Sequence, residues 1–159
     1  MIKVLFVCLG NICRSPMAEF VFRDMVKKNG ISDKFFIASA GTSDEEEGNP
    51  VHRGTRAKLK EFGIDTSGKT AVPLKKEDYS RFDYIIGMES RNLSSMERIF
   101  KGDPDKKISR LLDLSPRPRD IADPWYTGNF DVTYEDVYEG CKLLLEHICN
   151  KEGISRERS

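Results

Sequence analysis

The feature that most constrains this chain is an apolar run at its start, followed at once by a short loop and a helix signal. Residues 2–8 are apolar except for Lys3. Such a continuous run is typical of a strand buried on both faces, as in a parallel sheet. Ser15 and Pro16 then predict a helix start, with serine as the N-cap and proline at the first helical position. The chain is therefore predicted to open as strand, tight loop and helix.

Strands and helices are predicted to alternate along the rest of the chain. The expected strands cover 35–39, 82–87 and 106–112. The expected later helices cover 51–62, a stretch from about 90, and a final segment that starts at a Thr133-x-x-Asp136 capping signal. This alternation implies an α/β fold with a parallel sheet. We expect one domain over 1–150 and a frayed, charged C-terminal tail over 151–159.

Composition argues against several classes of protein. With 26 basic and 26 acidic residues the formal net charge is zero, which gives no general reason to expect binding to nucleic acid or to an anionic membrane. No stretch approaches the ~20 apolar residues of a membrane span, and no secretory leader is recognisable, so we expect a cytoplasmic protein. Four cysteines and two histidines form neither a disulfide framework nor a zinc-type spacing, so no metal is expected.

The loop after the first strand carries the candidate chemistry. It reads Cys8-Leu9-Gly10-Asn11-Ile12-Cys13-Arg14-Ser15. Gly10 and Asn11 tolerate left-handed backbone, so successive N–H groups can turn inward as a nest for an anion. Arg14 and Ser15 stand at a helix start, which also attracts anions. These surroundings favour a cysteine thiolate, and a thiolate facing a bound phosphate group is a nucleophile aimed at phosphorus.

These residues resemble those of the low-molecular-weight protein tyrosine phosphatases. The segment Val7-Cys-Leu-Gly-Asn-Ile-Cys-Arg-Ser-Pro16 matches the phosphate loop of that family, and Asp123-Pro124 matches its general-acid motif. The resemblance covers residues 2 to about 150. It implies a Rossmann-like phosphatase I fold, in which one three-layer domain has a four-stranded parallel sheet flanked by helices.

The resemblance also implies an activity, which is hydrolysis of phosphotyrosine in proteins and of small aryl phosphates. Cys8 would form a phosphocysteine intermediate, Arg14 would grip the phosphoryl oxygens, and Asp123 would act as general acid and then as base. The phosphate group, or a similar oxyanion as product or inhibitor, would be bound by Leu9, Gly10, Asn11, Ile12, Cys13, Arg14 and Ser15. No cofactor is implied.

Other positions match the family less completely. Asn11, Ser15 and Ser39 stand where the family supports its loop, and Ser15 would donate a hydrogen bond to the thiolate. Gly68 stands where animal members have a supporting histidine, so we expect that support to be absent. Cys13 would form a reversible disulfide with Cys8; the alternative is a small apolar residue that fills the back of the loop.

The substrate wall is expected to contain Leu9, Glu45, Trp125 and Tyr126. Two aromatic residues beside a general acid suit a phenyl ring. Glu45 stands where many family members have an aromatic residue, and its acidic run either favours basic substrate flanks or is a solvated surface. We expect a monomer or weak self-association through exposed aromatic residues.

The remaining cysteines and histidines are expected to have structural positions. Cys141 and Cys149 are eight residues apart on one predicted helix, about 12 Å, and too far apart for a disulfide. His52 and His147 are expected to be surface or helix residues.

Three other functions share part of this pattern. A thioredoxin-coupled arsenate reductase would need two further cysteines near the site, and residues 15–140 contain none. A protein-arginine phosphatase of the same family tends to have threonine where this chain has Ile12. A phosphate-binding module without turnover would be expected to lack Cys8 or Asp123.

Overall fold

Strand β1 (Ile2–Cys8) lies inside the sheet in the computed structural model, which describes residues 1–156. Its parallel neighbours are β2 (Phe35–Gly41) and β3 (Tyr84–Gly87), and β4 (Ile108–Arg110) pairs with β3. The order is therefore β2-β1-β3-β4, with all strands parallel. The expected α/β fold with a four-stranded parallel sheet is confirmed.

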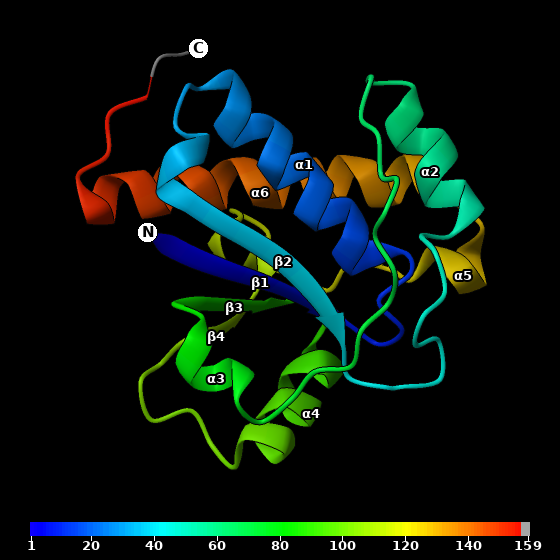
Figure 1. Cartoon of the computed structure of the whole chain (residues 1–159), viewed down its shortest axis with the longest axis horizontal. Helices are drawn as coiled ribbons and strands as arrows, with labels where there is room; N and C mark the ends of the chain where they lie inside the picture. Colours follow the sequence, from blue (N-terminus) through cyan, green and yellow to red (C-terminus); the bar gives the residue numbers. More distant parts are fainter. Residues whose placement is uncertain (157–159) are drawn as a thin grey trace.

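Helices cover both faces of this sheet (Figure 1). On one face lie α1 (Arg14–Lys28) and α6 (Phe130–Glu152), and on the other lie α3 (Asp78–Arg81) and α4 (Ser90–Phe100). Two further helices lie toward the carboxyl ends of the strands, α2 (Arg53–Lys60) and α5 (Pro124–Thr127). Single turns of 3-10 helix cover Ser32–Lys34 and Leu111–Leu114.

The side chains of β1 alternate between two apolar clusters. Val4, Phe6 and Cys8 belong to the cluster that includes buried residues of α1 and α6. Leu5 and Val7 belong to the cluster that includes buried residues of α4. All five residues are buried. A strand whose successive side chains point to opposite faces needs apolar residues at every position when both faces are covered, which explains the continuous run.

The strand order places the candidate loop at a favourable point of the sheet. The chain passes from β1 to β2 on one side and later returns to β3 on the other side of β1. In open α/β sheets, ligands bind beyond the carboxyl ends of the strands where the order reverses in this way. That point is the end of β1, where Val7 pairs with Gly87 and the chain continues into Cys8.

The start of α1 differs from the expectation. The helix begins at Arg14 with Cys13 as its N-cap residue, and no side chain caps it. Ser15, the predicted N-cap, lies inside the first turn. Its hydroxyl interacts instead with Cys8 and Asn11. The predicted cap is therefore wrong because the serine side chain is used by the loop.

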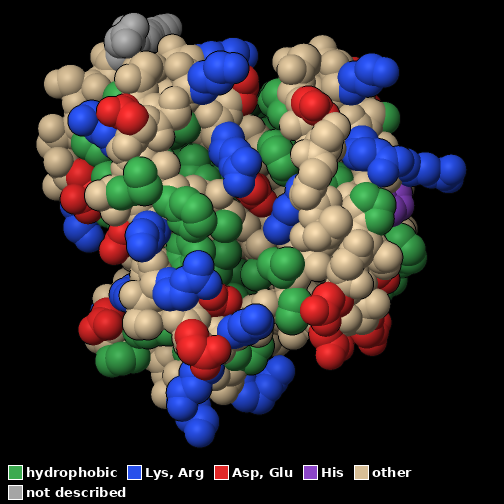
Figure 2. Space-filling view, viewed as in Figure 1, with side chains coloured by type: hydrophobic (Ala, Val, Ile, Leu, Met, Phe, Trp, Pro, Cys, Tyr) green, Lys and Arg blue, Asp and Glu red, His purple; other side chains and the backbone are tan. Residues whose placement is uncertain are grey.

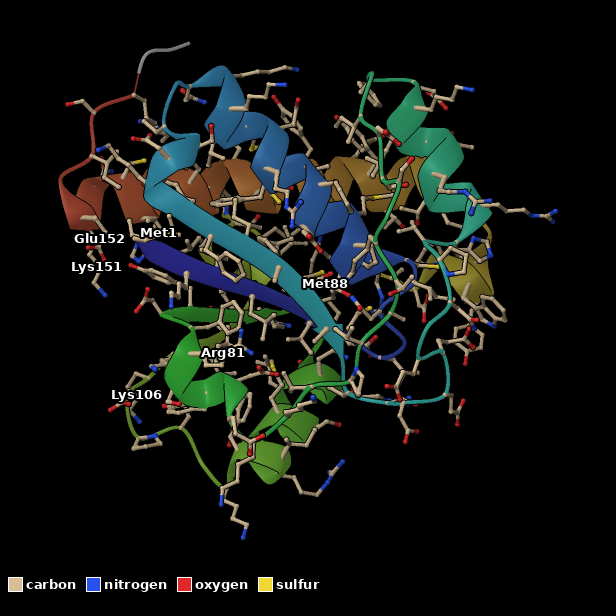
Figure 3. The ribbon with its side chains drawn as sticks, in the orientation of Figure 1. Met1, Arg81, Met88, Lys106, Lys151 and Glu152 are labelled. Atoms are coloured by element: carbon tan, nitrogen blue, oxygen red, sulfur yellow. The ribbon has the colours of Figure 1, made fainter. Side chains whose placement is uncertain are left out.

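The start of α6 also differs from the expectation. Asn129 caps this helix by accepting a hydrogen bond from the N–H of Val132 at 3.1 Å, so the predicted start at Thr133 is wrong. The helix continues to Glu152, whose carboxylate accepts a hydrogen bond from Tyr84 of β3 at 3.2 Å. Figure 3 labels Lys151 and Glu152 in the last turn of this helix. Residues 157–159 of the expected tail lie outside the described residues.

Smaller differences concern the lengths of the elements. β2 runs two residues past its expected end at 39, and β4 is shorter than the expected 106–112. The helix expected over 51–62 is α2. The Asp123-Pro124 motif stands at the start of a short helix, α5.

The surface carries an acidic segment beside the carboxyl end of the sheet. Figure 2 shows acidic side chains gathered over the loop between β2 and α2, which contains Asp44, Glu45, Glu46 and Glu47. Among residues 1–156, none of the helices combines the length and the apolar character that crossing a bilayer requires.

Gly140 of α6 packs closely against Leu111, and a substitution at Gly140 tests this packing. A Cβ at Gly140 would lie 2.4 Å from Leu111 Cγ and 3.0 Å from its carbonyl oxygen. In an open helix position, glycine to alanine adds roughly 0.5–1 kcal/mol of stability. Overpacking costs about 1–3 kcal/mol. We therefore expect Gly140→Ala to lower the free energy of unfolding, measured by chemical denaturation.

The exposed Glu135 on the same helix provides the control. Glu135→Ala should change the free energy of unfolding by less than about 0.5 kcal/mol. A Gly140→Ala protein more stable than the parent would contradict the close contact with Leu111.

Candidate active site

The loop between β1 and α1 turns around the sulfur of Cys8. Asn11 has a φ of 58°, which is the expected left-handed backbone, whereas Gly10 does not adopt it. The N–H of Asn11 donates to Cys8 Sγ at 3.3 Å. The N–H groups of Gly10, Ile12 and Cys13 donate to no protein atom within the described chain. These groups are therefore available to an anion.

The carbonyl groups of the loop are bound on its outer side. Thr42 N donates to Cys8 O at 2.9 Å, and Ser43 N donates to Leu9 O at 3.0 Å. A Cβ at Gly41 would lie 2.8 Å from Leu9 O, so glycine is needed where β2 passes the loop. Because the carbonyl oxygens of Cys8 and Leu9 are bound to the segment after β2, the loop is fixed from that side.

The three predicted support residues meet behind the loop. Ser15 Oγ lies 3.0 Å from Cys8 Sγ and accepts a hydrogen bond from Asn11 Nδ2 at 2.8 Å. The same nitrogen donates to Ser39 Oγ at 2.9 Å. All four side chains are buried, so their polar groups depend on one another for hydrogen bonds.

The guanidinium group of Arg14 is almost completely buried, with 2% of the side chain exposed. It forms an ion pair with Glu89, donates to Ile121 O at 2.9 Å, and lies 3.4 Å from Asp123 Oδ2. Burial lowers the pKa of Arg14, but the Cys8 thiolate and the Glu89 carboxylate outweigh it, so the pKa is raised above its ordinary value. The Nε–H of Arg14 has no partner within residues 1–156.

The segment that carries Asp123 is held against this loop. Asp123 is the N-cap of α5, and its Oδ1 accepts a hydrogen bond from Trp125 N at 3.0 Å. Oδ2 is the atom that faces Arg14. Pro124 occupies the first turn and fixes the backbone there. With 19% of its side chain exposed, Asp123 is reachable from solvent.

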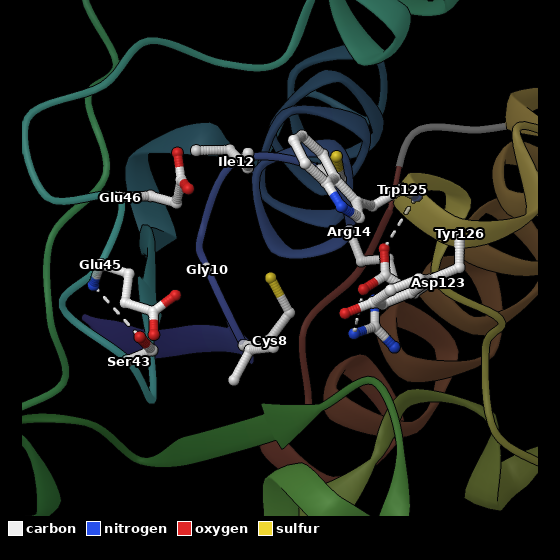
Figure 4. Close-up of a pocket in the computed structure, with 12 residues that line it drawn as sticks. Cys8, Gly10, Ile12, Arg14, Ser43, Glu45, Glu46, Asp123, Trp125 and Tyr126 are labelled. Atoms are coloured by element: carbon white, nitrogen blue, oxygen red, sulfur yellow. Dashed lines mark hydrogen bonds and ion pairs between the residues drawn. The ribbon is translucent and has the colours of Figure 1, made fainter.

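These residues surround one cavity of about 160 Å³. In Figure 4, Asp123, Trp125 and Tyr126 lie on one side of Cys8, and Glu45 and Glu46 lie on the other. Trp125 and Tyr126 are 58% and 78% exposed, so their rings are free to contact a ligand. The lining residues are Cys8, Leu9, Gly10, Ile12, Cys13, Arg14, Ser43, Glu45, Glu46, Asp123, Trp125 and Tyr126.

The structure places most of the predicted site residues in this lining. The predicted nucleophile, arginine and general acid all line the cavity, as do all four predicted wall residues. Asn11 and Ser15, which were also predicted to bind the phosphate group, do not line the cavity; they contact Ser39 and one another behind the loop, in keeping with a supporting role. Glu46 and Ser43 are additional lining residues that the sequence did not single out.

Gly68 has no side chain to support the loop, but the residue after it reaches the segment behind the loop. Lys69 extends to Ser39, where its Nζ donates to the carbonyl oxygen at 2.9 Å. The same ammonium group lies 3.8 Å from the carboxylate of Glu19. The side chain expected to be missing at Gly68 is thus absent, and Lys69 contacts Ser39 from the next position.

Glu89 is a site residue that the sequence reasoning missed. It lies two residues after the end of β3 and is the N-cap of α4. Because the carboxyl ends of parallel strands meet at one edge of a sheet, residues that follow β1 and β3 are neighbours. That rule could have drawn attention to Glu89 as a partner for Arg14.

His52 was expected to be only a surface or helix residue, but it also contacts Trp125 of the site. Its Nδ1 accepts a hydrogen bond from Gly54 N at 3.0 Å and so caps α2. Its ring stacks on Phe130 with centroids 5.4 Å apart and meets Trp125 edge-on at 5.5 Å. The sequence gives no signal for this contact, because α2 and α5 are far apart along the chain.

All four cysteines are buried, and burial raises the pKa of Cys13, Cys141 and Cys149. The pKa of Cys13 rises to about 12, chiefly through burial and then through the charges of Cys8 and Asp123. Burial also raises the pKa of Cys141 and Cys149. Cys141 and Cys149 belong to the apolar core around α6, away from the cavity.

A prediction for thiol alkylation follows from these values. A thiol with a raised pKa stays protonated until the pH approaches that value, and only the thiolate reacts readily. At about pH 8, roughly four units below the pKa of Cys13, its thiolate fraction is about one in ten thousand. We expect iodoacetamide to leave Cys13, Cys141 and Cys149 unmodified in peptide maps of the folded protein.

Unfolding in guanidinium chloride supplies the control, because all four cysteines should then react. Alkylation of Cys13 in the folded protein at the rate of a free cysteine would contradict the burial described above.

Comparisons with known proteins agree with this geometry. The family model described as "Low molecular weight phosphotyrosine protein phosphatase" matches residues 3–155. The chain is 43% identical over 150 residues to the low molecular weight protein-tyrosine-phosphatase YfkJ of Bacillus subtilis, covering 93% of this chain and 96% of that one. The crystal structure of YfkJ superposes with a TM-score of 0.92 at 42% identity over 96% of this chain and 97% of that chain.

Two further solved structures have the same fold. SP-PTP, a low molecular weight protein tyrosine phosphatase from Streptococcus pyogenes, has a TM-score of 0.85 at 43% identity, with 97% of each chain covered. The Drosophila arginine phosphatase DARP has a TM-score of 0.84 at 31% identity, covering 92% of this chain and 98% of that one. The cavity, the fold and these matches together show that the chain belongs to the low-molecular-weight phosphotyrosine protein phosphatase family.

Proposed function

We propose that this protein hydrolyses phosphotyrosine in proteins, and small aryl phosphates, through a phosphocysteine intermediate. The observation that carries the proposal is the single cavity in which Cys8, Arg14 and Asp123 meet beneath Trp125 and Tyr126. A nucleophile, an anion-binding cation and a carboxyl group are the parts that phosphoryl transfer to a thiolate requires.

In the first step the Cys8 thiolate attacks phosphorus, and the bond between phosphorus and the tyrosine oxygen breaks. Loop N–H groups and Arg14 bind the phosphoryl oxygens, and an oxygen there gives the unpartnered Nε–H of Arg14 an acceptor. The bond electrons pass to the tyrosine oxygen. Asp123, in its carboxylic acid form, donates a proton to this oxygen, and tyrosine leaves.

In the second step water hydrolyses the phosphocysteine. The Asp123 carboxylate accepts a proton from water as the water oxygen attacks phosphorus. The sulfur–phosphorus bond breaks, and its electrons return to Cys8 as the thiolate. Ser15 Oγ, 3.0 Å from that sulfur, stabilises the leaving thiolate by donating a hydrogen bond. Inorganic phosphate is released.

The shape of the cavity favours an aryl phosphate. Trp125 and Tyr126 offer two exposed rings beside Asp123, and such rings contact a phenyl group well. Ile12 adds an apolar side chain to the lining. Ile12 offers no hydrogen-bond partner to the guanidinium N–H groups of a phosphoarginine side chain.

The other candidate functions fit less well. Arsenate reduction through a cysteine relay needs thiols near Cys8, and Cys141 and Cys149 lie in the core around α6. A binding module without turnover would not need a carboxyl group beside the bound anion, yet Asp123 is held there by Arg14 and by the first turn of α5.

Cys13 is proposed to protect the nucleophile. It lines the same cavity as Cys8. When peroxide oxidises Cys8 to a sulfenic acid, the Cys13 thiol attacks the Cys8 sulfur, a disulfide forms and water leaves. The raised pKa of Cys13 makes this closure slow near neutral pH, because little thiolate is present.

The activity is tested with two peptides in the presence of EDTA, one carrying phosphotyrosine and one carrying phosphoarginine. We expect phosphate release from the phosphotyrosine peptide only. Cys8→Ser should abolish this release while inorganic phosphate still binds, as measured by calorimetry, because the loop amides and Arg14 remain.

The outcomes separate the alternatives. Preference for the phosphoarginine peptide would contradict the substrate assignment, and release by Cys8→Ser at the wild-type rate would contradict the nucleophile. No release from either peptide would contradict the phosphatase function as a whole.

The acid role of Asp123 is tested by comparing how much Asp123→Asn slows the hydrolysis of substrates with poor and with good leaving groups. A poor leaving group needs a proton and a good one does not, and general acid catalysis is worth about a hundredfold to ten-thousandfold. Asp123→Asn should therefore slow hydrolysis of phenyl phosphate by about that factor and of 4-nitrophenyl phosphate much less. Equal losses on both substrates would argue against the acid role.

A further inference from the structure

A chain of hydrogen bonds leads from Cys8 into the protein behind the loop. Ser15 Oγ lies 3.0 Å from Cys8 Sγ, and Asn11 Nδ2 donates to Ser15 Oγ at 2.8 Å. Asn11 Nδ2 also donates to Ser39 Oγ at 2.9 Å. The chain therefore connects the candidate nucleophile with strand β2, where Ser39 lies.

The chain ends at a group of buried charges. Ser39 Oγ donates to Glu19 Oε1 at 2.5 Å. Lys69 Nζ lies 3.8 Å from that same oxygen and donates to the carbonyl oxygen of Ser39 at 2.9 Å. Arg23 pairs with the other oxygen of Glu19 at 2.5 Å. Glu19 and Lys69 are largely buried, with 3% and 13% of their side chains exposed, whereas Arg23 is half exposed.

The direction of these hydrogen bonds follows from their fixed donors. The N–H of Val72 donates to Asn11 Oδ1 at 3.0 Å, so Oδ1 is an acceptor and Nδ2 must face the two hydroxyl groups. Each hydroxyl then accepts from Asn11 and has its own proton left to donate. Ser39 gives its proton to Glu19, and the Ser15 proton can be given to Cys8 Sγ, which lies 3.0 Å from Ser15 Oγ.

This direction suits a thiolate rather than a thiol. A thiolate accepts hydrogen bonds and donates none, and the Ser15 proton has the sulfur as its neighbour. Ser39 accepts from Asn11 and donates to Glu19, so it helps to hold the Asn11 amide group in place. Glu19 accepts that hydrogen bond with Oε1, and Lys69 and Arg23 lie beside the two oxygens of Glu19.

We propose that Lys69 is a positioning residue for Cys8, acting through Glu19 and Ser39 to hold the hydrogen-bond chain in the direction that favours the thiolate. The inference rests on the proposed function, because it concerns the proposed nucleophile. It adds a residue from a segment that neither the loop motif nor the acid motif includes. Lys69 acts through other side chains and does not touch the substrate.

The charges around Lys69 agree with this role. Burial lowers the pKa of Lys69, Arg23 lowers it further, and the charges of Glu19 and the Cys8 thiolate raise it, with a net decrease. The attraction between the Cys8 thiolate and the Lys69 ammonium group is mutual. It therefore stabilises the charged form of Cys8 to the same extent as the charged form of Lys69. Lys69 contacts Glu19 of α1 directly, and the charges of Arg23 and Cys8 also act on it. Cys13 and Arg14 are the groups whose charges interact with Cys8 from the loop itself.

The experiment measures the alkylation rate of Cys8 by iodoacetamide as a function of pH. Fragment-ion spectra of the tryptic peptide distinguish Cys8 from Cys13. Lys69→Gln removes the charge and retains a donor for Ser39 O, and Lys69→Arg retains both. Lys76→Gln changes an exposed lysine outside the cavity lining and is the matched control.

We expect Lys69→Gln to move the midpoint of the profile upward by about 0.5–1 pH unit, which is about a three- to tenfold loss of alkylation rate below the midpoint. Lys69→Arg and Lys76→Gln should overlay the wild type. A folded Lys69→Gln protein with the wild-type midpoint would overturn the proposal. So would a Lys69→Arg profile shifted as far as that of Lys69→Gln.

A second variant applies if Lys69→Gln does not fold. Ser39→Ala leaves the Lys69–Glu19 pair in place and removes the hydroxyl that links it to Asn11, so the same upward shift is expected. An unshifted Ser39→Ala profile would overturn the proposal. Alkylation needs no phosphorylated substrate, so a failure to hydrolyse phosphotyrosine would contradict the proposed function and leave this result standing.

Discussion

The candidate site depends on one buried cation. Arg14 is the first residue of α1, and its guanidinium group binds Glu89, Ile121 and Asp123, which are 75, 107 and 109 residues further along the chain. A guanidinium group with 2% of its side chain exposed is stable only when such partners satisfy it. The position of Asp123 relative to Cys8 is therefore fixed by Arg14, in addition to the role proposed for it in binding phosphate.

The sheet supplies the geometry that makes this arrangement possible. Cys8 ends β1 and Glu89 follows β3, and these strands are parallel neighbours. Their carboxyl ends meet where the strand order reverses, which is the usual ligand site of open α/β sheets. α1 begins at that point, so its first N–H groups and the loop amides face the same space.

Much of this site could be predicted from the sequence because its parts are local. The strand, the loop and the helix follow one another within 28 residues, so each is visible in a short segment. The four parallel strands, the loop and Asp123-Pro124 were all accessible to pattern and resemblance. The start of α1 was not, because the Ser15 hydroxyl bonds with Asn11 and Cys8 instead of capping the helix.

Contacts between distant segments could not be predicted in the same way. Gly68 departs from the family pattern, and the sequence alone gives no sign that Lys69 reaches Ser39 from the next position. His52 contacts Trp125 only because α2 and α5 pack near each other beyond the sheet. Glu89 is an intermediate case. Its position after β3 can be predicted from the sequence, but its ion pair with Arg14 cannot.

The central claim is that Cys8 attacks phosphorus, and the most direct measurement is to trap the product of that attack. Wild-type protein is mixed with a phosphotyrosine peptide, quenched in acid within the first turnover, digested and examined by mass spectrometry. The account predicts a peptide that carries one phosphoryl group on Cys8, which appears before free phosphate and disappears as phosphate is released. Phosphate release without a phosphoryl group on Cys8 at any time, or with one on another residue, would contradict it.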